Sequence, residues 1–521
     1  MRVGYFGVVC WLAWACSATS VYGQEKRIRD VVIVRQDVFP DVTGKPRFLY
    51  EWANGLHIVT RETVIRRELL FKPGDAYDPD LLEESERKLR ALPYLGEVRI
   101  EVEREGADFV DVRVTTQDQW STLLSWILNT GGGRTIFGGS VEEFNFLGLG
   151  KRIFVQLTHE VSEGPTLTLR YNDPQLLFSR WTAQAGFVSG PFIKNLTAQL
   201  VRPFYSLDTR WAFGLGGNVR DEILRLFEDG QEASRLRFEN VGFEMLGARA
   251  FGTRYQKAKL QLSYRFQKRD FETIEGGTTT ELPNDELIHA LAVSGSLEFL
   301  GFVKERQIDR FVKTEDITLG SVTTLRLGRT GLPFPVGVRR FELNFTSRHT
   351  YRLWQRQYLL FLLGFQTLFE RDTIWSFRLR YYNRLSRRQT LAFNLEFDYG
   401  HNLERSRQFL LGGDSGLRGY PARGFSGNKR LLLNLEDRLF SHVTLLTVAL
   451  GGVVFVDAGH VWREHEPFNL RDLNFSVGVG LRLGYTKSPN SRVGRFDFAW
   501  RLNGGGGFGF SIGVDQQFSL N

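Results

Sequence analysis

Apolar and polar side chains alternate along most of the chain after residue 119. Residues 473–485 carry Leu, Phe, Val or Tyr at every second position, with Asn, Ser, Gly or Arg between them. Residues 258–266, 375–381 and 391–399 repeat this pattern. A period of two is that of a β-strand with one apolar face. Many of these runs reach nine to thirteen residues, which exceeds the usual strand of a soluble sandwich and suffices for a tilted strand to cross a bilayer.

The alternating region, residues 119–521, therefore predicts a transmembrane antiparallel β-barrel in a mainly β chain. Aromatic residues end several apolar faces, as at Tyr485, Trp462 and Trp500, where the interfacial girdles of a barrel lie. Outside the first 23 residues there is no stretch of 18 uncharged apolar residues, which excludes membrane helices. A sheet with lipid on one face must close on itself to pair every backbone group. The alternative is a soluble secreted β-protein.

Residues 26–117 mix strand and helix patterns and predict a separate domain. Two helices are expected in it, one capped by Thr60 and one capped by Asp78 with Pro79 in its first turn. Strand-like apolar runs lie at 31–34, 98–102 and 110–114. The order strand, helix, helix, strand, strand indicates a small α+β domain with its helices on one face of a three-stranded sheet.

The first 23 residues predict a secretory signal peptide. Arg2 precedes an apolar stretch at 3–18, and Val21-Tyr22-Gly23 forms a cleavage pattern before Gln24. The chain's two cysteines, Cys10 and Cys16, both lie in this segment, so the mature chain needs no disulfide. A membrane anchor and a lipoprotein cleaved at Cys16 are the alternatives.

Composition supports a β-rich exported protein. The chain contains 54 Gly, 43 Phe, 16 Tyr and 11 Trp but only 2 Met, a balance poor in helix formers. Hydrophobic residues make up 42% and charged residues 24%, which argues against a disordered chain and a bundle of membrane helices. The net charge is +8, but no run of five Lys or Arg occurs, so nucleic-acid binding is not expected.

Three segments match catalytic or metal motifs only in part. Residues 413–416 read Gly-Asp-Ser-Gly, as around a protease serine, but no histidine and carboxylate partners are identifiable. Residues 148–151 lack the spacing and the Ser or Thr of a phosphate loop. The His and Glu residues within 460–466 fit a hydrated loop better than a metal site. We therefore expect no enzymatic activity, no cofactor and no metal.

One nine-residue segment resembles a family signature. Residues 412–420 resemble the G-G-x-x-x-[VL]-R-G-[FY] signature of the BamA/TamA-like outer-membrane assembly superfamily, also called the bacterial surface antigen family. The matching positions are Gly412, Gly413, Leu417, Arg418, Gly419 and Tyr420. Further segments resemble the family in the same order along the chain, namely Glu143–Gly150, Asn434–Arg438, Phe455–Trp462 and 478–499. Residues 26–117 resemble a POTRA domain, so the resemblance covers nearly the whole mature chain.

The resemblance implies a barrel of sixteen strands with eleven before the signature loop, and more strands are compatible with the pattern. About fifteen candidate runs precede the loop, so we expect some of them to be broken strands or loop hairpins. Only one POTRA-like domain is found, whereas BamA-like proteins carry several. The family's C-terminal signal is matched by Ser511, Gly513 and Phe518, but Gln516 departs from it.

The resemblance also implies that the signature loop folds back into the barrel and that its arginine pairs with acidic groups of the inner wall. The period-2 pattern turns Glu436 inward and, because Val454, Val456 and Ala458 are expected to face lipid, it turns Asp457 inward as well. A guanidinium bonds two carboxylates in a fixed fork, so Arg418 is predicted to pair with Glu436 and Asp457.

A protein of this kind is expected to assemble, insert or translocate other β-barrel proteins by strand templating at the barrel seam and at the POTRA sheet edge. The expected place is the outer membrane of a Gram-negative bacterium, with the N-terminal domain in the periplasm. The expected partners are unfolded client proteins and the lipid bilayer, with accessory lipoproteins or periplasmic chaperones as further candidates. The alternatives are a two-partner secretion pore that exports one protein and a passive porin-like channel.

Overall fold

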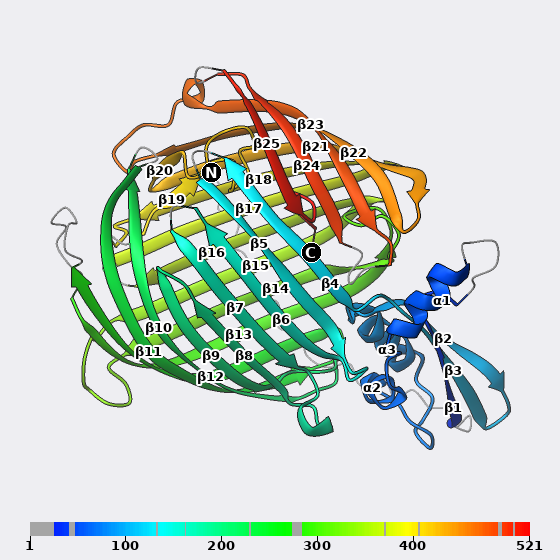
Figure 1. Cartoon of the computed structure of the whole chain (residues 1–521). Helices are drawn as coiled ribbons and strands as arrows, with labels where there is room; N and C mark the ends of the chain where they lie inside the picture. The colour runs from blue at the N-terminus through cyan, green and yellow to red at the C-terminus, as the bar shows by residue number, and fades with distance from the viewer. Residues whose placement is uncertain are drawn as a thin grey trace, which may run out of the picture.

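The computed structural model describes residues 26–520 except 41–46, 132–133, 162, 229–230, 274–283, 369–370, 405–406, 488–491 and 504–505. The predicted signal peptide lies outside the described residues. The described chain forms two parts, a small N-terminal domain and a large barrel (Figure 1).

The N-terminal domain is a three-stranded sheet with helices. Its sheet has the order β1-β3-β2, with β1 parallel and β2 antiparallel to the central strand β3. One core of buried aliphatic and aromatic side chains joins α2 and α3 to the sheet, and Ile65, Leu89 and Val112 lie at its centre. The elements are β1 (Arg27–Gln36), α1 (Arg47–Leu56), α2 (Glu62–Glu68), α3 (Pro79–Ala91), β2 (Leu95–Glu105) and β3 (Phe109–Asp118).

Two details of this domain differ from the sequence prediction. The structure contains an additional helix, α1, in the stretch that the sequence left irregular. Thr60 is not the cap of α2, because Arg61 takes that position and the Thr60 amide and hydroxyl both donate to Asp118, at 2.7 and 2.8 Å. The predicted cap of α3 is confirmed, since the Asp78 side chain accepts a hydrogen bond from the amide of Asp80.

The barrel is one antiparallel sheet of twenty strands whose neighbours follow the chain order, with β25 beside β4 at the seam. Two short strands between β18 and β21, and the 3₁₀ helices η1 (Leu176–Phe178) and η2 (Leu470–Asp472), lie outside this ladder. The strands are β4 (Thr122–Gly131), β5 (Arg134–Phe146), β6 (Lys151–Glu160), β7 (Gly164–Asp173), β8 (Thr182–Ser189), β9 (Ile193–Arg202), β10 (Trp211–Glu228), β11 (Gln231–Gly252), β12 (Gln256–Thr273), β13 (Glu286–Glu305), β14 (Glu315–Thr330), β15 (Phe341–Trp354), β16 (Gln357–Leu368), β17 (Arg371–Ser386), β18 (Gln389–His401), β21 (Lys429–Leu445), β22 (Val448–Trp462), β23 (Asn474–Tyr485), β24 (Val493–Arg501) and β25 (Phe508–Val514).

The strand number corrects the sixteen implied by the family resemblance. Fifteen strands, β4 to β18, precede the signature loop, and five follow it. The expectation that some of the fifteen runs were broken strands or hairpins was wrong. Each run pairs in register with its neighbours, as β11 does with β12 from Leu236 to Gly252.

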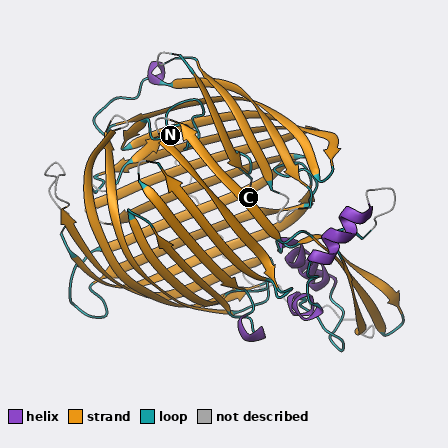
Figure 2. Ribbon diagram, viewed as in Figure 1, coloured by secondary structure: helices purple, strands orange, loops and turns teal. Residues whose placement is uncertain are grey.

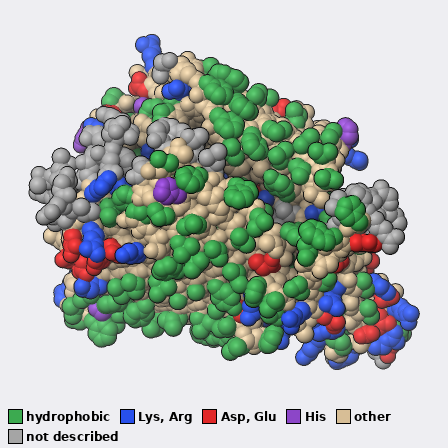
Figure 3. Space-filling view, viewed as in Figure 1, with side chains coloured by type: hydrophobic (Ala, Val, Ile, Leu, Met, Phe, Trp, Pro, Cys, Tyr) green, Lys and Arg blue, Asp and Glu red, His purple; other side chains and the backbone are tan. Residues whose placement is uncertain are grey.

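The two faces of the barrel wall differ as the alternation predicts. On β23, Val479 and Leu481 are exposed on the outer face, whereas Ser476 and Arg482 are buried on the inner face. Figure 3 shows hydrophobic side chains spread over the visible barrel wall, while acidic and basic side chains gather over the N-terminal domain. Such an apolar outer face is typical of a wall in contact with lipid. None of the helices in the described part of the chain is long and apolar enough to span a bilayer.

The N-terminal domain rests on one rim of the barrel, here called the inner rim; the opposite rim is called the outer rim (Figure 2). The Arg90 guanidinium on α3 holds Asp316 at the start of β14 with two hydrogen bonds of 2.9 and 2.7 Å. Arg254, in the turn between β11 and β12, bonds Asp78 at 2.9 Å. These contacts fix the helices of the domain across the turns of the inner rim.

A second junction joins the domain to the start of the barrel. The Asn145 amide donates to the Thr60 hydroxyl at 2.8 Å, and its carbonyl oxygen accepts from the Gly150 amide at 2.7 Å. Thr60 in turn bonds Asp118, and burial raises the pKa of that carboxyl to about 6. The segment Glu143–Gly150, identified from its resemblance to a family motif, thus forms the turn that connects the domain to the wall.

Candidate functional site: the signature loop and the barrel seam

The loop that connects β18 to β21 folds into the barrel. Its strands β19 (Phe409–Leu411) and β20 (Phe425–Gly427) pair with each other, and a small apolar cluster fixes it to the wall. Leu417 and Tyr420, two of the signature positions, belong to this cluster. The signature glycines permit the path, because Gly419 has a φ of +90° and a side chain on Gly412 would meet the Pro421 carbonyl.

Arg418 occupies the centre of the site and is almost completely buried. Its Nε and Nη2 atoms donate to the two oxygens of Asp457, both at 2.7 Å, and Nη1 donates to Glu436 at 2.8 Å. The guanidinium also lies over the Phe455 ring, 3.4 Å from its centre. The three side chains singled out from the sequence therefore meet inside the barrel, in the two-pronged geometry that an arginine permits.

The structure adds partners that the sequence analysis did not identify. Asp497 on β24 lies 3.5 Å from Arg418, and Asn434 bonds both Asp457 at 2.7 Å and the Gly416 carbonyl at 2.9 Å. Arg438 bonds the second oxygen of Glu436 at 2.9 Å. The sequence does contain a signal for Asp497. The alternation of residues 493–501 places Asp497 on the same face of its strand as Arg495.

Four arginines and four carboxylates around the loop form one connected network of ion pairs. The network joins the signature loop, the inner faces of β21 to β24 and the turn between β13 and β14, and its members are Arg418, Arg438, Arg482, Arg495, Asp309, Glu436, Asp457 and Asp497. Buried charges persist only when paired and hydrogen-bonded, so the loss of one member is costly. The predicted outward direction holds for Val454 and Val456, whereas Ala458, which pairs with Phe475, is buried.

The signature loop also contacts the strands at the seam. A side chain on Gly509 of β25 would lie 2.5 Å from Gly419, and a side chain on Gly419 would lie 3.1 Å from Ala499 of β24. The Tyr420 hydroxyl donates to the Phe475 carbonyl at 3.0 Å. The loop backbone therefore lies directly on the inner face of the last two strands, and Arg418 anchors it there.

The seam itself is asymmetric. β25, with 7 residues, is the shortest barrel strand and pairs with β24 along its whole length. β25 lies beside β4 in the closed barrel, and among the described residues these two strands approach each other over a shorter stretch than any other neighbouring pair of the wall. The seam is thus the least extensive contact between neighbouring strands of the wall.

The chain turns into the barrel after β25. Asp515 has a φ of +67°, and Phe518 and Leu520 beyond it are buried inside the barrel. Arg438 donates to the Phe518 carbonyl at 2.7 Å, and the Leu520 amide donates to Asp309 at 2.8 Å. Of the predicted C-terminal signal, Ser511 and Gly513 lie on the inner face of β25, but Phe518 leaves the strand and does not extend its lipid-facing row.

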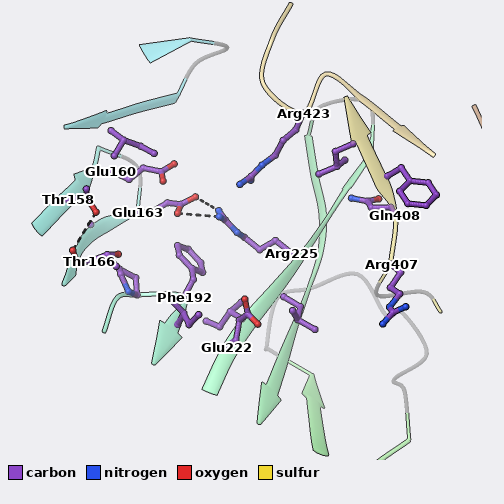
Figure 4. Close-up of a pocket in the computed structure, with 18 of the residues that line it drawn as sticks. Thr158, Glu160, Glu163, Thr166, Phe192, Glu222, Arg225, Arg407, Gln408 and Arg423 are labelled. Atoms are coloured by element: carbon purple, nitrogen blue, oxygen red, sulfur yellow. Dashed lines mark hydrogen bonds and ion pairs between the residues drawn. The ribbon is translucent and has the colours of Figure 1, made fainter. Parts of the chain in front are cut away.

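A cavity of about 810 Å³ lies inside the barrel near the outer rim (Figure 4). Glu160, Glu163, Arg225 and Arg423 line it, and Arg225 pairs with Glu163. Across the part of the chain that the structure describes, no group of three or more His, Cys, Asp or Glu side chains is arranged to hold a metal. His460 stacks on Trp462, and Glu464 pairs with His401.

Comparison with known proteins identifies both parts of the chain. Residues 355–518 match the Omp85 superfamily domain, and residues 54–117 match the POTRA family, described as surface antigen variable number repeat. A search of curated protein sequences gives no significant match.

Solved structures with similar folds have little sequence in common with the chain. BamA from Haemophilus ducreyi lacking POTRA domains 1–3 is 13% identical, with a TM-score of 0.41 over 94% of this chain and 84% of that one. CdiB from Acinetobacter baumannii is 13% identical, with a TM-score of 0.45 over 95% and 74%. CdiB from Escherichia coli is 13% identical, with a TM-score of 0.44 over 94% and 76%. The two family matches give the chain a POTRA domain at residues 54–117 and an Omp85 superfamily domain at residues 355–518, and with the fold they support a BamA/TamA-like protein of the kind that inserts or translocates other proteins at the outer membrane.

Proposed function

We propose that the protein lies in the outer membrane of a Gram-negative bacterium and inserts β-barrel clients by templating their strands at the seam between β25 and β4. The observation that carries this proposal is the seam itself, where β25, the shortest strand of the wall, meets β4 over a shorter stretch than any other neighbouring pair among the described residues. An unpaired strand edge offers a row of backbone donors and acceptors to an incoming strand. The client is an unfolded outer-membrane protein, and the process requires neither an enzyme active site nor a cofactor.

The N-terminal domain offers a second edge for the client. β2 lies at one side of the three-stranded sheet, and its residues from Glu101 to Glu105 are exposed. An extended client segment is able to add to this edge before it reaches the barrel. Because no nucleotide drives the process in the periplasm, the folding free energy of the client is the driving force. The two strand edges serve to lower the free-energy barrier to client insertion.

A secretion pore is the second candidate function. The cavity near the outer rim favours it, because residues of the loop between β18 and β21, among them Phe409 and Arg423, line this cavity. A passive porin agrees less well with the structure, since the loop and the C-terminal segment both occupy the lumen. In a secretion pore the client would pass through the lumen, whereas in an insertion factor it would pass through the seam.

Locking the seam with a disulfide is expected to abolish client insertion. Cysteine pairs tested along Leu123–Ser125 of β4 and Gly509–Ile512 of β25 would cross-link the two strands that lie side by side at the seam. We expect the oxidised protein to lose most of its ability to fold an unfolded outer-membrane barrel protein into liposomes, and reductant to restore it. The folded product is measured by its heat-modifiable migration on a gel.

The matched control locks two strands far from the seam. Thr197 and Asn218 are paired residues of β9 and β10, and a disulfide between cysteines at these positions should leave insertion intact. Full insertion by the seam-locked protein would overturn the templating proposal.

A further inference from the structure

Helix α1 exposes one apolar stripe. Phe48, Trp52 and Leu56 follow one another at intervals of four residues, so they lie on the same side of the helix. Their exposed fractions are 71%, 66% and 58%, which are high for large apolar side chains. A helix with aromatic and aliphatic residues on a single face is the pattern of a segment that lies in the plane of a membrane interface.

The stripe is not needed for the fold of the N-terminal domain. The domain core is formed by residues of α2, α3 and the three strands, and no described residue of α1 belongs to it. α1 instead occupies the connection between β1 and α2. Its apolar residues are therefore available to a surface outside the domain.

Phe39 links α1 to the inner rim close to the seam. Asn54 near the end of α1 exchanges hydrogen bonds with the Phe39 backbone at 3.2 and 3.0 Å, and Lys487 of the β23–β24 turn lies over the Phe39 ring. Lys487 also accepts a hydrogen bond from the Trp120 amide at 2.9 Å, directly before β4. In Figure 1, α1 lies at the upper edge of the N-terminal domain, beyond the barrel rim.

The outer face of β4 continues from this point into the apolar wall. Leu124 and Trp126 are 70% and 92% exposed on that face. Four residues, or about 13 Å of extended strand, separate Trp120 from Leu124. This distance matches the step from the headgroup region, where tryptophan is favoured, to the hydrocarbon core.

We propose that α1 is an interfacial membrane helix whose Phe48, Trp52 and Leu56 side chains enter the periplasmic leaflet of the outer membrane beside the seam. The occupant of the stripe is the lipid surface, because Phe39 links α1 to the rim beside the seam and the outer face of the neighbouring strand β4 exposes Leu124 and Trp126. Insertion of α1 fixes the N-terminal domain at the membrane surface and places bulky side chains among the lipids next to β4. This inference rests on the proposed placement of the barrel in a membrane.

Single labelled cysteines test this placement in the full-length protein. With Cys10 and Cys16 removed, no other cysteine is present, so Trp52→Cys, Glu51→Cys and Trp126→Cys each carry one environment-sensitive fluorophore. The proteins are placed in nanodiscs of phosphatidylethanolamine and phosphatidylglycerol, with or without lipids brominated near the headgroup. We expect brominated lipid to quench the label at position 52, and its emission to shift to the blue, whereas the label at the exposed position 51 on another side of α1 is quenched much less.

The label at position 126 separates the two ways in which the inference can fail. If brominated lipid quenches position 126 but not position 52, the barrel is in the membrane and α1 is not, which overturns the inference alone. Protection of position 52 from an aqueous quencher without quenching by lipid would show that protein covers the stripe, and this also overturns it. If position 126 is not quenched, the membrane placement of the barrel fails and the inference fails with it.

Discussion

Replacement of Arg418 by alanine is expected to yield a folded barrel that has lost client insertion. The substitution leaves Asp457 and Glu436 buried without their shared guanidinium. Breaking a buried ion pair in this way typically costs about 3–5 kcal/mol. The strand ladders of the barrel do not depend on this residue. The lost free energy is therefore expected to weaken the docking of the loop and to leave the barrel folded.

Release of the loop should also affect the seam, because the loop packs against the inner faces of β24 and β25. Gly419 packs against Gly509 of β25, and Tyr420 bonds the wall at Phe475. Without Arg418 these contacts lose their anchor, and β25 loses the support of its inner face. The expected readouts are protease cleavage within residues 407–428 and loss of insertion of an unfolded barrel protein into liposomes.

Two further variants make this result interpretable. Arg418→Lys should recover only part of the activity, since an ammonium group does not reproduce the two-pronged contact with Asp457. Arg471→Ala removes an exposed arginine of an outer loop and should behave as the unaltered protein. A protease-resistant loop together with full insertion in Arg418→Ala would show that the network does not lock the loop.

Replacement of Phe518 by alanine is expected to release the C-terminal segment from the lumen. Phe518 is buried against Tyr382, with 6.1 Å between the ring centres, in a cluster that includes Leu520. Loss of a buried phenylalanine typically costs about 3–5 kcal/mol, which is large for the docking of a six-residue segment. An added non-specific endoprotease should then cleave the released segment, and the ion conductance of the barrel in planar bilayers should rise.

Phe510→Ala is the matched control for this variant. Phe510 lies on the lipid-facing side of β25, so its loss should leave the C-terminal segment protected and the conductance low. Equal protection of the segment in Phe518→Ala and in the unaltered protein would contradict the role assigned to its burial.

The strands of the barrel were predictable because contact with lipid imposes a strict alternation on every one of them. The pattern around residues 473–485 gave both the strand and its orientation, and β23 has both as expected. The number of strands was harder to predict, because the fifteen runs before the loop conflicted with the count that the resemblance implied. Each run proved to be a strand whose neighbours complete its hydrogen bonds.

The site was predictable only in part, because its members come from distant segments. Arg418 was identified from the signature. The alternation of apolar and polar residues predicted that Glu436 and Asp457 face the inside of the barrel, where the loop arginine was expected. Asp309 was missed since it lies in a turn of the inner rim and reaches Arg438 only through the barrel fold. Phe518 was identified only as part of the C-terminal signal. Its place inside the barrel was not predicted, because the left-handed backbone at Asp515 turns the chain inward and local sequence does not reveal such a turn.

The central claim, that a client passes through the seam, is tested most directly by site-specific photocross-linking during client insertion. A photoreactive residue is placed at Leu124 or Ile512 beside the seam, at Leu262 on the opposite wall, or at Thr158 in the outer cavity. The account predicts adducts with the unfolded barrel protein from positions 124 and 512 and none from 262 or 158. Adducts from position 158 alone would place the client in the lumen and contradict the account.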